Sequence, residues 1–569
     1  MFTGYSFALE YKLGDKIVRF NGKSSELYEI EENVRPNGLE ITIIPKTSLA
    51  VVSAYVDFDF AYALSDKVYV NGYQSWSTSR EYTAEDVQPG LMGLGKYPPV
   101  RNYCRIFGDY DFQTYSGKKG KFHSYSYTYV KRGEKIYLFG SLSEKSGFTV
   151  FHHDMAADRI SVQKDVEGVM LEEGQPYVLH SIYWLEGSYN DVFDKYFDAA
   201  GIKKPRFGRM KGYTSWYNYY GGITEEILSR DLEGLATMGD KADIFQIDDG
   251  YQTAVGDWLT VKEKKFPRGM KYLADKIHSY GYKAGLWLAP FNAQKSSKVV
   301  KNHPDWLIKG DDGKPETGSI AWGGAYTLDL YNPEAKEYIR EVFRCVFDEW
   351  GFDMVKLDFL YSECHTPRNG KSRGTIMTEA MEFLRECAGD KIILGCGVPL
   401  FPAFGTVDFC RISSDVGKSF KDPFYVKHSN QEIVSTKSAM NNTIFRRHLD
   451  GRAFINDPDV FYLRENDLFG KDKLFLRSGY LKFTEEQKSL LAKVNSMCAN
   501  VLFVSDNVGG YGAEQRRALE KLFGEENRTV VDASYVGKDC ISITYLEGTE
   551  LYKLDFNTIT GENKTVRAD

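Results

Sequence analysis

The chain has 569 residues, of which 42% are hydrophobic and 15% aromatic, and its formal net charge is −7. This length suggests about two to four domains. The mild charge and the lack of a basic stripe argue against nucleic-acid binding. No apolar run approaches the roughly 18 residues of a membrane span. The N-terminus lacks a signal-peptide pattern, and the eight cysteines form no CxxC pair. We therefore expect a cytoplasmic protein.

The first part of the chain, up to about residue 205, alternates apolar and polar residues with a period of two. Examples are Leu39–Ile44, Ser124–Val130 and Lys135–Gly140. Short strands separated by Gly, Asp, Asn and Lys turns are typical of a large antiparallel sandwich. We expect an N-terminal antiparallel β-sandwich domain over residues 1–205.

Beyond residue 205 strand-like runs alternate with helical ones, which is the pattern of βα units. The runs are Gly212–Tyr217, Ala242–Asp248, Tyr282–Pro290, Asp353–Phe359, Lys391–Gly397, Phe409–Asp415, Ala453–Asp457 and Asn500–Ser505. Eight runs predict a central (β/α)8 TIM barrel, the catalytic domain, over residues 206–508.

One barrel helix and the end of the chain have clear signals. Asn332 is a predicted N-cap, Pro333 occupies the first turn, and Gly351 ends the helix. Alternation returns over Thr529–Leu554, which predicts a small C-terminal antiparallel β-sheet domain over residues 509–569. The predicted fold class is thus multidomain, α/β plus all-β.

Charged and aromatic residues gather at the predicted strand ends, where barrel enzymes carry their functional groups. In chain order they are Tyr213, Trp216, Asp248, Asp249, Trp287, Lys356, Asp358, Cys396, Gly397, Arg411, Asp415, Asp457 and Asp459. Carboxylates and cations bind hydroxyls, and an indole covers the apolar face of a sugar ring. Each residue alone has a structural explanation, such as a helix cap or a core side chain. Their common location favours a sugar site.

Two of these carboxylates, Asp358 and Asp415, each follow an apolar run and form the minimum equipment for cleaving a glycosidic bond. One carboxylate must attack the anomeric carbon, and a protonated one must donate to the leaving oxygen. Lys356 shares a strand face with Asp358 and favours its ionised form. We therefore predict that Asp358 is the nucleophile and Asp415 the acid/base.

Nine motifs, in order along most of the chain, resemble those of the clan D α-galactosidases, specifically glycoside hydrolase family 36. They are Val70–Trp76, Gly212–Trp216, Gln246–Asp249, Gly256–Trp258, Leu286–Phe291, His303–Trp306, Lys356–Asp358, Arg411–Asp415 and Asn456–Asp459. Two residues depart from the family pattern. Tyr213 and Tyr251 stand where the family commonly has tryptophan, which concerns the identity of the sugar and not the reaction class.

The resemblance implies a retaining double displacement on a terminal α-linked galactose of an oligosaccharide, with Asp358 as nucleophile and Asp415 as acid/base. It implies that Asp248 and Asp249 hold the 4- and 6-hydroxyls of the sugar, and that Trp76 lies near the entrance of the pocket. It also implies no metal or other cofactor and a possible homo-oligomer. The other predicted substrate-binding residues are Lys356, Arg411, Trp287, Tyr213, Trp216, Cys396 and Gly397.

Several alternatives stay open from the sequence. An α-N-acetylgalactosaminidase or an α-galactosyl transglycosidase would use the same two aspartates. A metal-dependent barrel hydrolase is disfavoured, because none of the nine histidines falls at a predicted strand end. A non-catalytic sugar-binding protein is disfavoured by the presence of both carboxylates.

Overall fold

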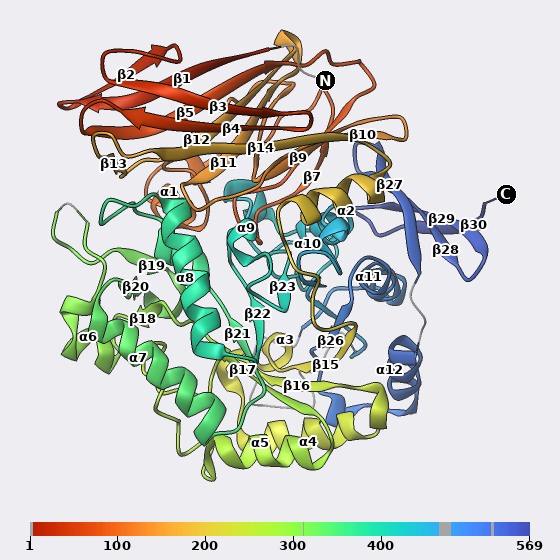
Figure 1. The fold of residues 1–569 in the computed structure, drawn as a ribbon. Helices are drawn as coiled ribbons and strands as arrows, with labels where there is room; N and C mark the ends of the chain where they lie inside the picture. Colours follow the sequence, from red (N-terminus) through yellow and green to blue (C-terminus); the bar gives the residue numbers. More distant parts are fainter. Residues whose placement is uncertain (1–3, 311, 466–479, 525–527, 569) are drawn as a thin grey trace.

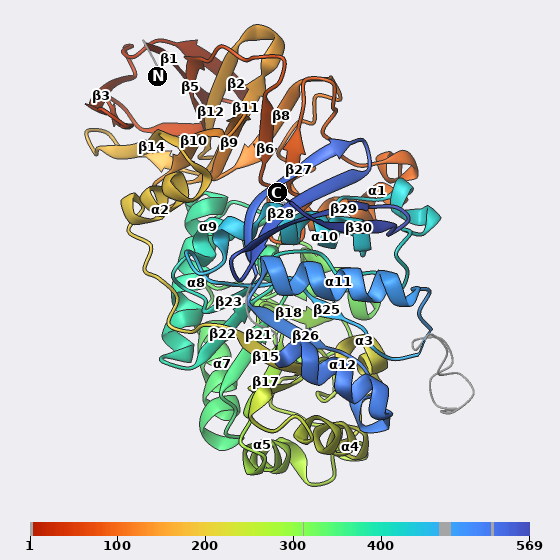
Figure 2. The same cartoon turned by 90° about the vertical axis from the view of Figure 1, so that its right-hand side faces the viewer.

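The computed structural model describes residues 4–310, 312–465, 480–524 and 528–568. Two antiparallel sheets stack face to face at the N-terminal end of the chain, above a parallel sheet surrounded by helices (Figure 1). A further antiparallel sheet formed by the end of the chain lies beside both parts (Figure 2).

The two N-terminal sheets enclose one hydrophobic core, with residues such as Val56 and Ile160 from the first sheet and Ile41 and Phe139 from the second. The first sheet has the order β2 (Lys16–Asn21), β1 (Tyr5–Leu13), β5 (Leu49–Asp59), β12 (Arg159–Asp165), β11 (Phe148–Asp154) and β8 (Lys121–Tyr125), with β13 (Met170–Leu171) paired to β5. The second has the order β3 (Tyr28–Arg35), β4 (Gly38–Pro45), β14 (Tyr177–Gly187), β10 (Lys135–Ser141), β9 (Tyr127–Arg132), β6 (Lys67–Val70) and β7 (Arg80–Tyr82).

The alternating segment Ser124–Val130 does not form one continuous strand. The segment is divided into β8 and β9, which belong to different sheets. Ser126 between them has a φ of 66°, and this left-handed conformation turns the chain from one layer to the other. Two helices also occur in this part of the chain, α1 (Val100–Cys104) and α2 (Tyr189–Ala199).

The parallel sheet contains all eight strands predicted for the barrel, each shorter than predicted. Its order is β24 (Ile455–Asp457), β23 (Phe409–Arg411), β22 (Ile392–Gly395), β21 (Met354–Leu357), β17 (Lys283–Leu288), β16 (Ile244–Ile247), β15 (Met210–Thr214), β26 (Val501–Val504) and β25 (Val460–Phe461). The two ends of this order, β24 and β25, are separated by only Pro458 and Asp459 in the chain. The sheet is therefore strongly curled.

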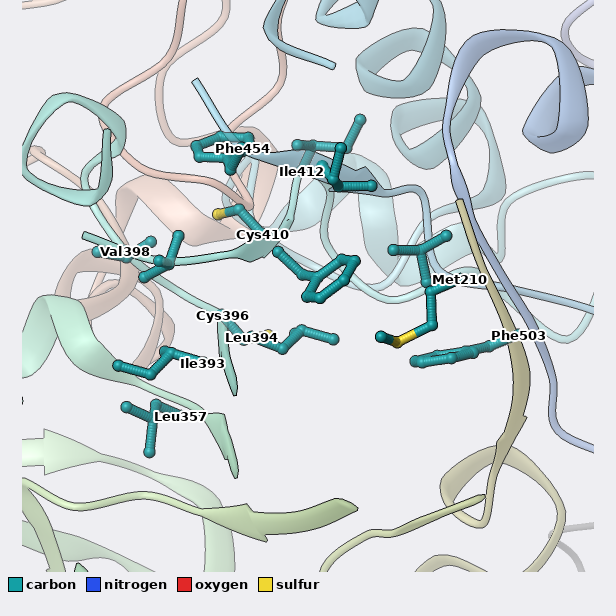
Figure 3. Close-up of a cluster of buried hydrophobic side chains, with 14 of the residues drawn as sticks. Met210, Leu357, Ile393, Leu394, Cys396, Val398, Cys410, Ile412, Phe454 and Phe503 are labelled. Carbon is teal, nitrogen blue, oxygen red and sulfur yellow. The ribbon is translucent and has the colours of Figure 1, made fainter. Parts of the chain in front are cut away.

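Helices cover the outside of the curled sheet (Figure 1), and side chains from its strands belong to a continuous core, part of which is shown in Figure 3. Met210, Leu394 and Phe503 come from β15, β22 and β26 and are buried there. The helices are α3 (Trp216–Tyr219), α4 (Glu225–Ala236), α5 (Gly269–Ser279), α6 (Lys298–Asn302), α7 (Pro333–Arg344), α8 (Arg373–Ala388), α9 (Leu400–Ala403), α10 (Thr436–Phe445), α11 (Glu485–Cys498) and α12 (Ala513–Gly524).

The helix predicted after Asn332 is confirmed. The Asn332 side chain accepts hydrogen bonds from the N–H groups of Glu334 and Ala335, and α7 starts at Pro333. A π-helical turn over Cys345–Glu349 continues it, and Gly351 follows with a φ of 82°. Asn332 thus caps the helix, and Gly351 adopts the left-handed conformation that commonly follows a helix end.

Two smaller sheets complete the fold. One is formed by β18 (Asn292–Gln294), β20 (Ala325–Thr327) and β19 (Thr317–Ser319), beyond the end of β17. The other joins β27 (Thr529–Gly537), β28 (Cys540–Glu547), β29 (Glu550–Asn557) and β30 (Asn563–Arg567), and it confirms the C-terminal sheet. Helix α12 precedes this sheet and is tied to the barrel side by the Lys241–Glu520 ion pair. The predicted domain boundaries stay predictions.

Candidate active site

A cavity of about 460 Å³ opens at the carboxyl ends of the parallel strands. Its walls combine residues in or after strands of the parallel sheet with residues from the N-terminal part of the chain. Its lining includes eight of the predicted site residues: Trp76, Trp216, Asp248, Asp249, Trp287, Lys356, Asp358 and Asp415. The cavity therefore contains both predicted catalytic carboxylates.

Asp358 is fixed by hydrogen bonds to both of its carboxylate oxygens. The indole Nε1–H of Trp287 donates to Oδ2 at 2.9 Å, and the N–H of Phe359 donates to Oδ1 at 2.9 Å. Burial raises the pKa of Asp358, while the nearby charge of Lys356 and the Trp287 hydrogen bond oppose that rise. The sequence suggested that Lys356 would dominate, but desolvation is the larger effect.

Lys356 forms its ion pair with Asp248 and not with Asp358. Its Nζ lies 2.9 Å from Asp248 Oδ2, with both side chains buried. Burial alone would lower the pKa of Lys356, but the charge of Asp248 raises it overall, so the ammonium group is retained. Asp248 follows β16, Lys356 lies in β21, and both line the cavity.

Asp249 points into the same cavity and is held by two donors. The Nε1–H of Trp322 donates to Oδ2 at 2.8 Å, and the Nε2–H of Gln252 donates to Oδ1 at 2.6 Å. Burial raises the pKa of Asp249. The Asp248–Asp249 pair thus presents two oriented carboxyl groups, and neither caps a helix.

Asp415 is more exposed than Asp358, with about a third of its side chain (34%) open to solvent. Arg411 Nη2 donates to its Oδ1 at 2.9 Å. The same guanidinium lies 2.5 Å from Asp459 Oδ2 and donates to the hydroxyl of Tyr217 at 2.9 Å. Arg411 is itself buried behind the cavity wall, so it orients Asp415 from the rear.

Asp459 belongs to this buried network. The sequence placed it at a strand end but assigned it no role. Its Oδ2 accepts from the N–H of Val416 at 2.7 Å and from the hydroxyl of Tyr217. Burial raises its pKa to about 7, against the opposing charge of Arg411. Two carboxyl groups therefore share one guanidinium.

Trp76 reaches the cavity from the N-terminal part and covers the end of β22. Its Nε1–H donates to Cys396 Sγ at 3.4 Å, and its ring packs edge-on against Phe359 and Tyr361. Cys396 is buried, and burial raises the pKa of its thiol well above the usual value. Cys396 is therefore a neutral thiol behind the cavity wall.

Gly397 is tightly covered by the Trp76 ring. It has a φ of 60°, and a Cβ added there would lie 2.9 Å from the indole. Gly397→Ala is expected to destabilise the protein by about 1–3 kcal/mol more than a glycine-to-alanine change in open space, because the indole must move. Gly451→Ala is the matched control, since Gly451 has a φ of 73° and no atom near its Cβ position.

Denaturant unfolding of both variants measures this difference. Equal losses of stability in the two variants would mean that the ring yields freely. A second check is the Gly397→Ala change combined with Trp76→Phe, which should recover part of the loss.

The sequence predicted that Tyr213 binds the substrate, and the structure contradicts this. It lies outside the cavity, stacks on Phe245 with ring centroids 4.4 Å apart, and its hydroxyl donates to Asp231 of α4 at 3.1 Å. The side chain therefore points to the helix layer. A direct sugar contact by Tyr213 does not fit this position, whereas Trp216, at the start of α3, does line the cavity.

Several lining residues were not predicted from the sequence. Trp322 has a φ of 58° in a loop after β19, and Glu432 comes from the segment between β23 and α10. The apolar lining residues that were missed are Tyr103, Phe107, Ile320, Phe359, Ile433 and Val434. For Trp322, the two glycines that follow it at 323 and 324 were a local sign of an unusual loop.

No group of three or more His, Cys, Asp or Glu side chains in the described part of the chain is arranged to hold a metal ion. No helix within the described ranges is long and apolar enough to cross a membrane.

Comparison with known sequences gives related results. Residues 216–381 match the family model named Melibiase. The α-galactosidase Mel36A of Lactobacillus acidophilus is 33% identical over 151 residues, which cover 25% of this chain and 20% of that protein. An A type blood α-D-galactosamine galactosaminidase of Flavonifractor plautii is 29% identical over 303 residues, 48% of this chain and 27% of that protein. The matched regions thus span a quarter or so of these relatives.

Comparison with solved structures covers nearly the whole chain. TtGalA, an α-galactosidase from Thermus thermophilus solved with p-nitrophenyl α-D-galactopyranoside, has a TM-score of 0.68 and 24% identity, covering 96% of this chain and 98% of that one. The family 36 α-galactosidase AgaA of Geobacillus stearothermophilus has a TM-score of 0.59 and 11% identity, covering 98% and 79%. Residues 216–381 thus match the Melibiase family, and the fold of nearly the whole chain is similar to that of solved α-galactosidases, including one of glycoside hydrolase family 36.

Proposed function

We propose that the protein is a retaining exo-α-galactosidase that removes terminal α-linked galactose by double displacement. The observation that carries this proposal is the pair of carboxyl groups, Asp358 and Asp415, on the wall of one sugar-sized cavity. The Melibiase match over residues 216–381 and the α-galactosidase names of its relatives support the same substrate.

In the first step Asp358 attacks the anomeric carbon while Asp415 gives its proton to the leaving oxygen. The hydrogen bonds from Trp287 and Phe359 hold the Asp358 carboxylate in one orientation, which lowers the entropic cost of attack. A covalent galactosyl-enzyme forms and the leaving alcohol departs neutral.

In the second step water attacks the same carbon and Asp415, now a carboxylate, takes a proton from it. Asp358 leaves as a free carboxylate, and galactose keeps its α configuration. Asp415 must exchange protons in every turnover, and its partial exposure to solvent suits this role. Asp248 and Asp249 are the groups that we assign to the 4- and 6-hydroxyls.

Galactose is favoured over N-acetylgalactosamine because relatives such as Mel36A of Lactobacillus acidophilus are named α-galactosidases. N-acetylgalactosamine is the second candidate, because one relative is named a galactosaminidase.

The test is the hydrolysis of p-nitrophenyl α-galactoside and its 2-acetamido analogue, followed by NMR of the sugar released. We expect activity on the galactoside alone, with α-galactose as the first product before it mutarotates. Release of β-galactose first would reject the retaining mechanism, and activity on the acetamido sugar alone would favour the second candidate.

We further infer that the curled sheet is a complete (β/α)8 barrel in which β24 and β25 are two halves of the seventh strand. The support is that they pair with opposite ends of the sheet and are separated by two residues only. A cytoplasmic location is also proposed, supported by the eight free cysteines.

A further inference from the structure

The outer half of the cavity differs in character from its catalytic half. Its rim is formed by apolar side chains from three separate segments: Tyr103 and Phe107 before the sandwich strand β8, Ile320 and Trp322 in the loop after β19, and Ile433 with Val434 before α10. Tyr103, Ile320 and Val434 are 56%, 40% and 39% exposed. These three side chains are therefore open to solvent, as expected of residues at the mouth of the cavity.

The polar side chains in this half are already bonded to one another. Ser77 and Tyr110 donate their hydroxyls to the two oxygens of Glu432 at 2.6 and 2.9 Å. Asn430 donates to Glu432 Oε2 at 3.0 Å and accepts from Ser429 at 2.9 Å. The network ties the rim to the N-terminal part of the chain and offers few free partners to the hydroxyls of a second sugar.

The polar group of Trp322 is also already bonded, so that its ring is what faces the cavity. Its Nε1–H is directed inward to Asp249 at 2.8 Å, so its polar group serves the galactose end of the cavity. Its ring packs against Phe359 and Trp287 and lines the cavity. The rim therefore presents mainly apolar and aromatic surface to the cavity.

We propose that the leaving-group half of the cavity selects α-galactosides whose aglycone is apolar, an alkyl, lipid or aryl group, over those in which a second sugar follows galactose. The inference rests on the proposed α-galactosidase activity and adds the class of substrate. The bond broken is the ordinary one: the glycosidic oxygen takes the proton of Asp415 and leaves as an alcohol.

The experiment compares methyl, butyl and octyl α-galactosides with melibiose. The leaving groups of the butyl and octyl compounds and of melibiose are all primary alcohols, so the chemical step is similar and the contacts differ. We expect kcat/KM to rise about tenfold or more from methyl to butyl, as burial of added methylenes predicts, and the butyl compound to exceed melibiose. A flat series, or melibiose as the better substrate, would overturn the proposal.

Val434→Thr tests the rim itself, since the side chain keeps its shape and gains a hydroxyl. The butyl-to-methyl ratio of kcat/KM should fall about threefold. Val531→Thr on β27, where Val531 is 50% exposed, is the matched control and should leave the ratio unchanged. An unchanged ratio in Val434→Thr would count against the rim.

The two proposals fail in different ways. An enzyme that cleaves p-nitrophenyl α-galactoside but shows no chain-length dependence keeps its function and loses this specificity. A protein that cleaves none of these galactosides lacks the proposed function altogether.

Discussion

Asp358→Ala is expected to lower kcat on p-nitrophenyl α-galactoside by roughly 10⁴-fold, because it removes the group that forms the covalent intermediate. The gap left beside Trp287 has room for a small anion. Added azide should therefore restore part of the turnover and give β-galactosyl azide, the product of a single inversion. Kinetics with product analysis by NMR measures both effects.

Asp358→Asn separates charge from shape in the same position. The amide keeps an oxygen that accepts from Trp287 but lacks a nucleophilic carboxylate, so its loss of activity should match that of the alanine variant. Asp390→Ala, at a fully exposed aspartate that pairs with Arg206, is the control for an unspecific effect. Substantial turnover in Asp358→Asn without azide would remove Asp358 from its proposed role.

The raised pKa of Asp358 has a consequence for this reaction. A carboxyl group is nucleophilic only when ionised, and burial raises the pKa of this one above the value of about 3.9 for a free aspartate. The acid limb of the activity profile should therefore lie at a higher pH than a solvated aspartate would give.

The strand ends were predictable because functional side chains gather where parallel strands end. Apolar runs that stop at or near charged residues predicted eight of the nine strands of the parallel sheet, and eight of the predicted site residues line the cavity. The sequence could not show on which side of the sheet the Tyr213 side chain lies. Strands buried on both faces have no polar side, since Met210 and Tyr213 are both buried, so their pattern does not distinguish the interior from the helix layer.

The outer half of the cavity could not be predicted, because its contacts join distant parts of the chain. Ser77 and Glu432 are hydrogen bonded, and Trp76 lies against Cys396. Local periodicity carries no information about which loops meet across such separations. Ser126 is a related case, because a left-handed serine inside an alternating run leaves no mark in the hydrophobic pattern.

Asp415→Ala is expected to act in proportion to how much the leaving group needs a proton. Melibiose releases a poor leaving group, and its kcat/KM should fall by about 10²–10⁴-fold. 2,4-Dinitrophenyl α-galactoside releases a phenolate that needs no protonation, and its first step should change by less than about tenfold. Burst kinetics on the dinitrophenyl substrate should then show the galactosyl-enzyme accumulating, because water attack also loses its base.

Asp459→Asn is the matched control for this test. It removes a second carboxylate from the same guanidinium, since Arg411 contacts both Asp415 and Asp459, but it keeps the proposed proton donor. Any loss in this variant should be similar for the two substrates. Equal losses on melibiose and the dinitrophenyl galactoside in Asp415→Ala would mean that Asp415 only shapes the site, and that the proton comes from another group beside Arg411.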